Sequence, residues 1–196
     1  MDQPSPQPAP GISARPSGPT ILTRSGILFA LDAPTEAMID IDDIAHALSN
    51  LCRFTGHTRL FYSVAEHSVL VSRLVPSHEA LAALLHDASE AYLGDVSRPL
   101  KSLLPEYRII EARVTEVIER RFSLGSCATP AIKSADRRML VAEQRQAMGN
   151  HDCWADFARV EAAAVMVDFL SPWSARQMFI DRFKELTRGA GRGGNP

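Results

Sequence analysis

The chain has 196 residues, of which 45% are hydrophobic, and its formal net charge is −2. A chain of this size can bury one core, and its charge gives no basis for binding duplex nucleic acid or an anionic membrane surface. The cysteines, Cys52, Cys127 and Cys153, form no CxxC pair, so they predict neither a disulfide framework nor a thiolate zinc site. Without a membrane-spanning apolar stretch or a signal-peptide pattern, we expect a cytoplasmic protein.

The order of expected elements is simple. Residues 1–20 are rich in Pro, Ser, Gly and Gln, and we expect a disordered leader because they cannot bury enough apolar surface to offset the entropy of ordering. A short hairpin around Ser25-Gly26 is expected within residues 21–29. Apolar spacing then predicts an all-α domain within residues 21–188 and a flexible tail at 189–196. The expected helices cover residues 42–52, 64–74, 78–92, 106–122, 130–146, 155–169 and 174–186.

The strongest chemical signal is the run Leu84-Leu85-His86-Asp87-Ala88-Ser89-Glu90, which the spacing places in a buried helix. Ionisable side chains in an apolar segment must be neutralised, paired or coordinated to a cation, because an unpaired buried charge is strongly unfavourable. A His-Asp pair alone is more often a hydrogen-bonded pair in a core than a metal site. Further ligand-type residues are therefore needed before a metal site is inferred.

Two other expected helices supply such residues. His67 lies in the expected helix 64–74, and Asp136 lies four residues after Ile132, on the apolar side of the expected helix 130–146. Together with His86 and Asp87 they would form a mixed nitrogen and oxygen site. Such a site suits zinc, manganese, cobalt or iron better than calcium or a soft copper ion, and the sequence does not choose among these metals.

The order of His67, His86-Asp87 and Asp136 resembles the H…HD…D signature of the HD-domain metal-dependent phosphohydrolases, an all-helical superfamily. Over residues 42–136 the chain is also similar to the bacterial 5′-deoxynucleotidases and the related phage deoxynucleoside triphosphate hydrolases. The motifs that carry this similarity are Arg53-Phe54, residues 63–68, residues 86–90, Gly94-Asp95, residues 98–101 and residues 133–136. The resemblance implies an HD-domain helical bundle around one divalent metal ion, with His67, His86, Asp87 and Asp136 as ligands.

The resemblance also implies two catalytic carboxylates. Glu90 would share a helical face with His86 and Asp87 and could reach a metal-bound water or the leaving oxygen. It could instead accept a hydrogen bond from a ligating histidine. Asp95 follows Gly94 and could orient the attacking water or bind a sugar hydroxyl, although such a residue can also simply end a helix in a turn.

Three further residues are expected at the substrate. By resemblance, Arg53 and Lys101 would bind phosphate at the mouth of the metal pocket, and the alternative is that both are solvated surface cations. Phe54 could stack on a base, or it could belong to the core.

The expected function is therefore metal-dependent hydrolysis of a small-molecule deoxynucleotide, with phosphate released from deoxynucleoside 5′-monophosphates. One alternative is a deoxynucleoside triphosphohydrolase of the dATP type that releases tripolyphosphate. Another is a nucleotide-binding regulator of the same fold, but a binder has no chemical need for all four ligands together with Glu90 and Asp95. The resemblance also implies a homo-oligomer.

Overall fold

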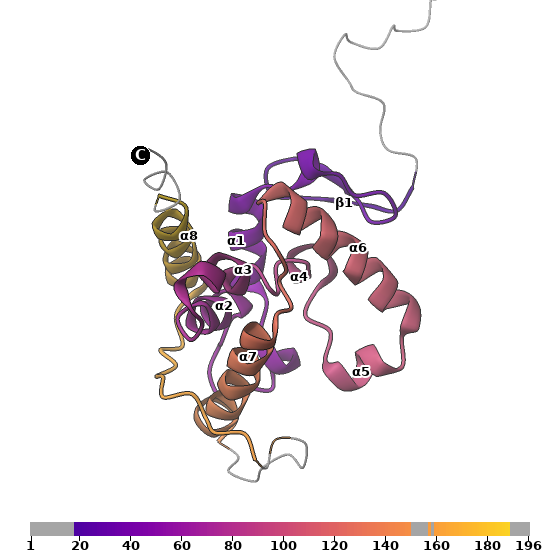
Figure 1. The fold of residues 1–196 in the computed structure, drawn as a ribbon. Coiled ribbons are helices and arrows are strands. Elements are labelled where there is room, and N and C mark those ends of the chain that lie inside the picture. Colours follow the sequence, from indigo (N-terminus) through magenta and orange to yellow (C-terminus); the bar gives the residue numbers. More distant parts are fainter. Residues whose placement is uncertain (1–17, 150–156, 158, 189–196) are drawn as a thin grey trace, which may run out of the picture.

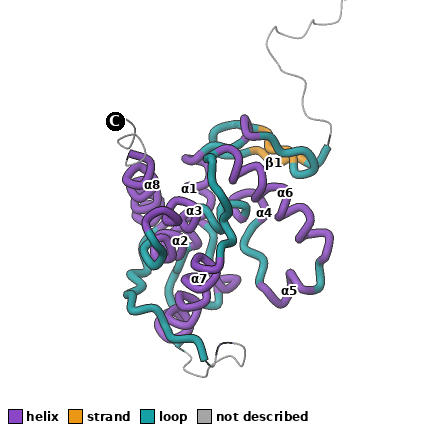
Figure 2. The backbone as a smooth tube through the Cα atoms, viewed as in Figure 1, coloured by secondary structure: helices purple, strands orange, loops and turns teal. Residues whose placement is uncertain are grey.

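The computed structural model describes residues 18–149, 157 and 159–188, and this part of the protein is mostly helical (Figures 1 and 2). The expected all-α class is confirmed. The five longer helices are α1 (Ile41–Asn50), α2 (Val64–Ser72), α6 (Pro105–Arg121), α7 (Pro130–Glu143) and α8 (Pro172–Arg188). The shorter ones are α3 (Ala80–Leu84), α4 (Glu90–Leu93) and α5 (Arg98–Ser102). They are joined by the 3-10 turns η1 (Glu36–Met38), η2 (Arg53–Gly56) and η3 (Ser77–Glu79), and by the π-helical turn η4 (Gln144–Met148).

The expected hairpin is also confirmed. Strand β1 (Thr20–Leu22) pairs antiparallel with β2 (Leu28–Ala30), and residues 23–27 form the turn between them. The hairpin is fastened to α1 because the Asp43 carboxylate accepts hydrogen bonds from the Ser25 backbone N–H at 2.9 Å and from the Ser25 hydroxyl at 2.6 Å. Of the expected leader, residues 1–17 lie outside the described part of the chain, as does the expected tail at 189–196.

Helix α2 is the centre of the core. All nine of its residues are buried, and α1, α3, α7 and α8 contact it (Figure 1). The Ser63 hydroxyl accepts a hydrogen bond from the Glu66 N–H and so caps the first turn. A helix buried on all sides cannot carry an ionisable residue such as His67 unless its neighbours satisfy it.

The helix expected over residues 78–92 is interrupted. Helix α3 ends at Leu84, residues 85–89 form a series of turns, and α4 begins at Glu90. His86 and Asp87 therefore lie in a turn rather than on a helix, which corrects the prediction. In a continuous helix the Ala83 carbonyl would accept from the Asp87 N–H, but here it is 2.7 Å from His86 Nδ1. The His86 side chain thus takes the place of the Asp87 N–H as the hydrogen-bond partner of the Ala83 carbonyl.

The prediction of a helix over residues 155–169 is wrong for those of its residues that the structure describes. Residues 150–156 and 158 lie outside the described part, and residues 159–170 are not helical (Figure 2). The Val167 N–H donates to Gln146 Oε1, and Gln146 Nε2 donates to the Val165 carbonyl. Burial alternates along Val165, Met166, Val167, Asp168 and Phe169, which is the two-residue period of an extended chain rather than the helical period.

The five other expected helices are confirmed, with ends that differ by up to three residues. No helix among the described residues is long and apolar enough to cross a membrane.

The buried Glu66 side chain fastens the extended segment to α2. Its carboxylate accepts hydrogen bonds from the backbone N–H groups of Asp168 at 2.7 Å, Phe169 at 3.2 Å and Leu170 at 2.9 Å.

Glu66→Ala would leave these N–H groups without their acceptor, and we expect it to lower the free energy of unfolding by about 3 kcal/mol or more. Guanidinium chloride unfolding measures this loss. The control is Glu106→Ala on the exposed face of α6, and a loss below about 1 kcal/mol for Glu66→Ala would contradict the assigned role.

Candidate metal centre

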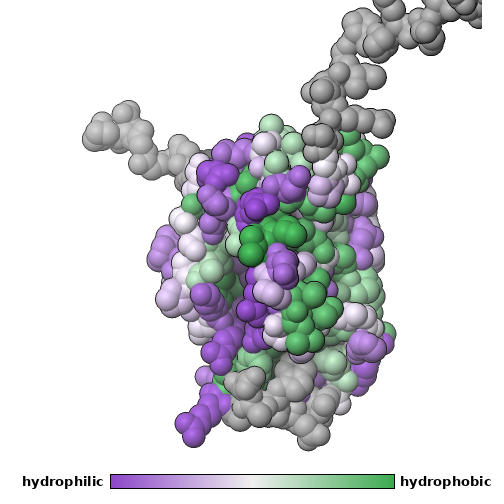
Figure 3. All heavy atoms as spheres, turned by 90° about the vertical axis from the view of Figure 1, so that its right-hand side faces the viewer, coloured by the Kyte–Doolittle hydropathy of each residue, from purple (hydrophilic) through white to green (hydrophobic). Residues whose placement is uncertain are grey.

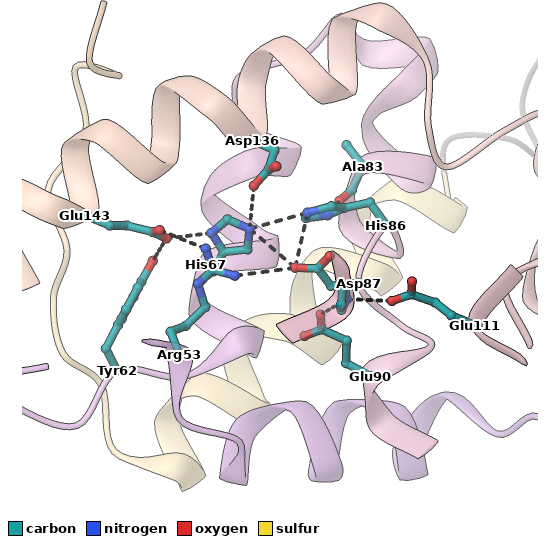
Figure 4. A network of polar contacts seen from close by, with 11 residues as sticks. Arg53, Tyr62, His67, Ala83, His86, Asp87, Glu90, Glu111, Asp136 and Glu143 are labelled. Atoms are coloured by element: carbon teal, nitrogen blue, oxygen red, sulfur yellow. Dashed lines mark hydrogen bonds and ion pairs between the residues drawn. The ribbon is translucent and has the colours of Figure 1, made fainter. Parts of the chain in front are cut away.

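Three ligand-type atoms converge between α2 and the turn after α3 (Figure 4). His67 Nε2 lies 3.3 Å from His86 Nε2 and 3.5 Å from Asp87 Oδ2, and His86 Nε2 lies 3.3 Å from Asp87 Oδ2. Nitrogen and oxygen ligands bind zinc at about 2.0–2.2 Å, so around a tetrahedral ion they lie roughly 3.3–3.6 Å apart. The three separations match this spacing, and the group could hold a metal ion.

Asp136 approaches the same nitrogen from α7. Its Oδ1 atom lies 3.4 Å from His67 Nε2, and its side chain is 28% exposed. Burial acts to raise the pKa of this carboxyl, but the hydrogen bond and charge of His67, together with the charge of His86, hold it well below its usual value. The structure brings Asp136 to the group, and its role as the fourth ligand stays a prediction.

The hydrogen bonds of the two imidazole rings set which nitrogen faces the centre. His67 Nδ1 lies 2.6 Å from Glu143 Oε1, and His86 Nδ1 lies 2.7 Å from the Ala83 carbonyl oxygen. Both partners are acceptors, so when either ring is neutral its Nδ1 keeps the proton and its Nε2 presents the lone pair. Both rings therefore present Nε2 to the same point.

Glu143 is a residue of the candidate site that the sequence analysis missed. It lies at the end of α7, is fully buried, and accepts from Arg53 Nη2 at 2.9 Å and from the Tyr62 hydroxyl at 2.7 Å in addition to its contact with His67 (Figure 4). Burial acts to raise its pKa, but the charges of Arg53 and His67 lower it to about 2. Glu143 is thus a carboxylate shared by a candidate ligand and a candidate phosphate-binding residue.

A signal for Glu143 was present in the sequence. It lies seven residues after Asp136, which places both on one face of α7, and it follows the apolar run of residues 140–142. The reasoning that singled out His86 and Asp87, that ionisable residues in apolar segments need partners, applies equally here.

Arg53 is buried at this site rather than solvated. It is 9% exposed, Nη1 lies 3.7 Å from Asp87 Oδ2, and Nε has no hydrogen-bond partner within the described residues. Phe54 follows with its ring 5.4 Å from the guanidinium carbon, and both Phe54 and Thr55 have φ of 54°. Left-handed conformation is uncommon for an aromatic residue, so the surrounding contacts must hold this turn in place.

Glu90 and Asp95 follow Asp87 closely in the sequence, and the charge of Asp87 raises the pKa of both. Glu90 begins α4, is 5% exposed, and its Oε2 is buried without a partner among the described residues. Burial and then the charges of Asp87 and Asp95 raise its pKa well above the usual value, and Lys101 opposes this. The pKa of Asp95 is also raised by burial, which Arg53 opposes and Asp87 reinforces. Both carboxyls are therefore biased toward the protonated form.

Lys101 is bound by carboxylates. Its Nζ lies 2.5 Å from Glu111 Oε1 and 3.4 Å from Glu90 Oε1. It is therefore not the solvated cation of the alternative interpretation, and its closest partners are Glu111 and Glu90 rather than the ligand atoms.

A cleft of about 330 Å³ adjoins the group. His86 and Asp87 line one side of it, and α6 lines the other. Two of the three candidate ligand residues thus line a cavity of a size that small-molecule sites occupy, roughly 300–1,000 Å³.

The fold and the site define a mostly helical protein with a candidate His-His-Asp metal centre. The chain belongs to the family of YfdR from Escherichia coli K12, an uncharacterized protein to which it is 41% identical over 169 residues, covering 85% of this chain and 95% of YfdR. An uncharacterized protein of Rhodobacter capsulatus is 38% identical over 146 residues, which cover 67% of this chain and 74% of that protein. No known family model matches the chain.

The contact between Glu143 and His67 leads to a testable prediction for metal affinity. In Glu143→Gln the neutral amide no longer supports the basicity of His67, and we expect Mn²⁺ or Zn²⁺ to bind roughly 10- to 100-fold more weakly. Isothermal titration calorimetry measures the change. Tyr62→Phe is the matched control, because it removes one hydrogen bond to Glu143 but leaves the carboxylate on His67. Unchanged affinity in Glu143→Gln would contradict the proposed role.

The pKa of His67 predicts how metal binding depends on pH. Burial and Arg53 act to lower it, but Glu143 and Asp136 outweigh them and raise it to about 9. At pH 7 the metal-free ring therefore holds a proton that a metal must displace, so affinity should rise by up to about tenfold per pH unit from pH 7 and level off above pH 9. Calorimetry in buffers of different ionisation enthalpy counts the released proton. Binding at pH 7 without proton release would refute this prediction.

Proposed function

We propose that this chain is an HD-domain metal-dependent phosphohydrolase that releases phosphate from deoxynucleoside 5′-monophosphates. The observation that carries the proposal is the convergence of His67 Nε2, His86 Nε2 and Asp87 Oδ2, with Asp136 on the same histidine. These are the residues of the H…HD…D pattern in the order that the pattern requires.

The donor set and two buried atoms support the fit of a metal and a phosphate. Imidazole nitrogens and carboxylate oxygens are ligands for zinc, manganese, cobalt and iron. Arg53 Nε and Glu90 Oε2 are buried without hydrogen-bond partners in the described part of the chain, and each belongs to a residue beside Asp87. Buried polar atoms normally have partners, so two unmet ones next to the ligand group favour a bound substrate.

The side chains then have distinct roles. A divalent ion held by the ligands would lower the pKa of a bound water and polarise a phosphoryl oxygen. Arg53 Nε donates a hydrogen bond to a phosphate oxygen. Glu90, with its raised pKa, delivers a proton to the leaving 5′-oxygen, and Asp95 orients the attacking water or binds a sugar hydroxyl. Lys101 holds the Glu90 carboxylate and reduces the negative charge that a phosphate meets.

The charge of the adjoining cleft favours a monophosphate over a triphosphate. Its α6 side carries three glutamates and only one cation, Arg108. A triphosphate chain along this wall would meet like charge, whereas a monophosphate needs only the metal and Arg53.

An apolar surface supports the expected homo-oligomer. Large hydrophobic side chains are exposed on the face that contains α5 and the start of α6 (Figure 3), namely Leu100, Leu103, Leu104 and Ile109. Contiguous exposed apolar surface often marks a protein interface.

The function is tested by product analysis of deoxynucleoside mono- and triphosphates with Mn²⁺, Co²⁺ or Zn²⁺. We expect orthophosphate from monophosphates. Asp87→Ala should lose metal and turnover, whereas Glu90→Gln should keep metal and slow hydrolysis by roughly 10²- to 10⁴-fold.

Other outcomes would contradict parts of the proposal. Tripolyphosphate from triphosphates would identify a triphosphohydrolase, and nucleotide binding without turnover by any metal-loaded form would identify a regulator. Full metal occupancy in Asp87→Ala would overturn the ligand assignment.

A further inference from the structure

Helix α5 carries Lys101 but does not by itself determine where the Lys101 side chain lies. The helix has five residues, and none of them is buried. A lysine side chain is a compact charge on a flexible four-carbon stem, so it takes a fixed position only where its surroundings restrict it. The place of the ammonium group therefore depends on the groups that it contacts.

Glu111 is the closest carboxylate to Lys101 among the described residues. Glu111 Oε1 lies 2.5 Å from Lys101 Nζ, whereas Glu90 Oε1 lies 3.4 Å from it. Glu111 is on α6, three residues before Val114 and seven before Ile118, and both of these are buried on the same helical face. Because this face packs α6 into the core, Glu111 gives Lys101 a fixed anchor that α5 does not provide.

A second residue of α6 acts on the same group. Tyr107 lies one turn before Glu111, and its ring centre is 5.6 Å from Lys101 Nζ, a distance at which an aromatic ring attracts a cation. The Tyr107 hydroxyl also donates a hydrogen bond to the Gly94 carbonyl at 3.3 Å. One face of α6 thus holds both Lys101 and the loop that leads into Asp95.

The contact with Lys101 makes the two oxygens of the Glu90 carboxylate unequal. Oε1 accepts from Lys101 Nζ, whereas Oε2 is buried without a hydrogen-bond partner among the described residues. The last torsion of a glutamate side chain is broad, so its oxygens can change places unless one of them is held. Lys101 therefore determines which oxygen of Glu90 stays free.

We propose that Glu111 is a positioning residue, which holds the Lys101 ammonium on Glu90 Oε1 and so keeps Glu90 Oε2 available to the substrate. This inference rests on the proposed function and adds to it a residue of α6. Glu111 acts through Lys101 and touches no reacting atom, so its loss should slow the chemical step without changing metal binding. Misplacement of a reacting group by about 1 Å can cost roughly 10²-fold in rate.

Steady-state kinetics of the Mn²⁺-loaded protein, with the monophosphate that the wild type hydrolyses, tests the role in turnover. We expect Glu111→Gln to lower kcat by about tenfold and to leave KM and Mn²⁺ affinity unchanged. Lys101→Met should also lower kcat, and adding Glu111→Gln to it should cause no further loss, because the two residues act as one unit. Glu106→Gln, exposed on α6 and outside the cleft, is the control and should keep the wild-type kcat.

Chemical labelling tests the contact between Glu111 and Lys101 without any turnover. Acetic anhydride reacts with a neutral amine. Burial acts to lower the pKa of Lys101, but Glu90 and Glu111 outweigh it and raise this pKa. Glu111→Gln should lower the pKa and so accelerate acetylation of Lys101, by roughly tenfold for each pKa unit, as measured by peptide mass spectrometry. Labelling at the wild-type rate would overturn the inference.

The kinetic outcomes separate this inference from the proposed function. Hydrolysis by Glu111→Gln with the kcat of the wild type overturns the inference and leaves the phosphohydrolase intact. A further loss of kcat in the double variant also overturns it, because Glu111 would then act independently of Lys101. An equal loss in Glu116→Gln, which alters the same cleft without a contact to Lys101, would attribute the effect to the charge of the cleft and overturn the inference as well.

Absence of orthophosphate from every monophosphate with the wild type would overturn the proposed function and the role of Glu111 in turnover. The labelling rate would then still decide whether Glu111 holds Lys101.

Discussion

The rest of the structure depends on the burial of Glu143, a fully enclosed carboxylate that receives hydrogen bonds from Arg53, Tyr62 and His67. A buried charge of this kind is strongly unfavourable unless several donors compensate it. Here the donors come from η2, from the residue just before the α2 cap and from α2 itself, while Glu143 comes from the end of α7. The chain cannot bury any one of these groups without assembling all of them, so closing the core also brings His67 to the candidate metal centre.

A single hydrogen bond of His86 both ends helix α3 and orients the His86 ring at the candidate metal centre. The contact of His86 Nδ1 with the Ala83 carbonyl ends α3 and turns His86 Nε2 toward His67 Nε2. Without that interruption His86 and Asp87 would point in directions about 100° apart around a helix. In the turn, both side chains instead reach the same imidazole of α2. The break that the sequence analysis did not predict is therefore what brings two adjacent residues to the same candidate metal centre.

Local sequence patterns were sufficient to predict the elements whose structure depends mainly on interactions between residues close in the sequence. The hairpin around Ser25-Gly26 and the helices of the core followed from periodicity and turn chemistry, and buried ionisable residues identified His67, His86 and Asp87. Residues 159–170 were misread because their hydrogen bonds go to Glu66 and Gln146, which are distant in sequence. The Lys101 contacts with Glu90 and Glu111 were likewise beyond prediction, since they depend on how the chain from α4 through α5 to α6 folds back.

The carboxylates around the candidate metal centre explain how the Arg53 guanidinium is held in place. Three carboxylates, Asp87, Asp136 and Glu143, contact the two imidazoles, so the metal-free site would disfavour a phosphate dianion. Arg53 is held closely by Glu143 at 2.9 Å and only loosely by Asp87 at 3.7 Å. Under the proposed function, coordination of Asp87 would weaken the looser contact and free Arg53 Nη1 for a phosphate oxygen. The tighter bond from Nη2 to Glu143 would persist and keep the guanidinium oriented, so phosphate affinity would depend on occupancy of the candidate metal site.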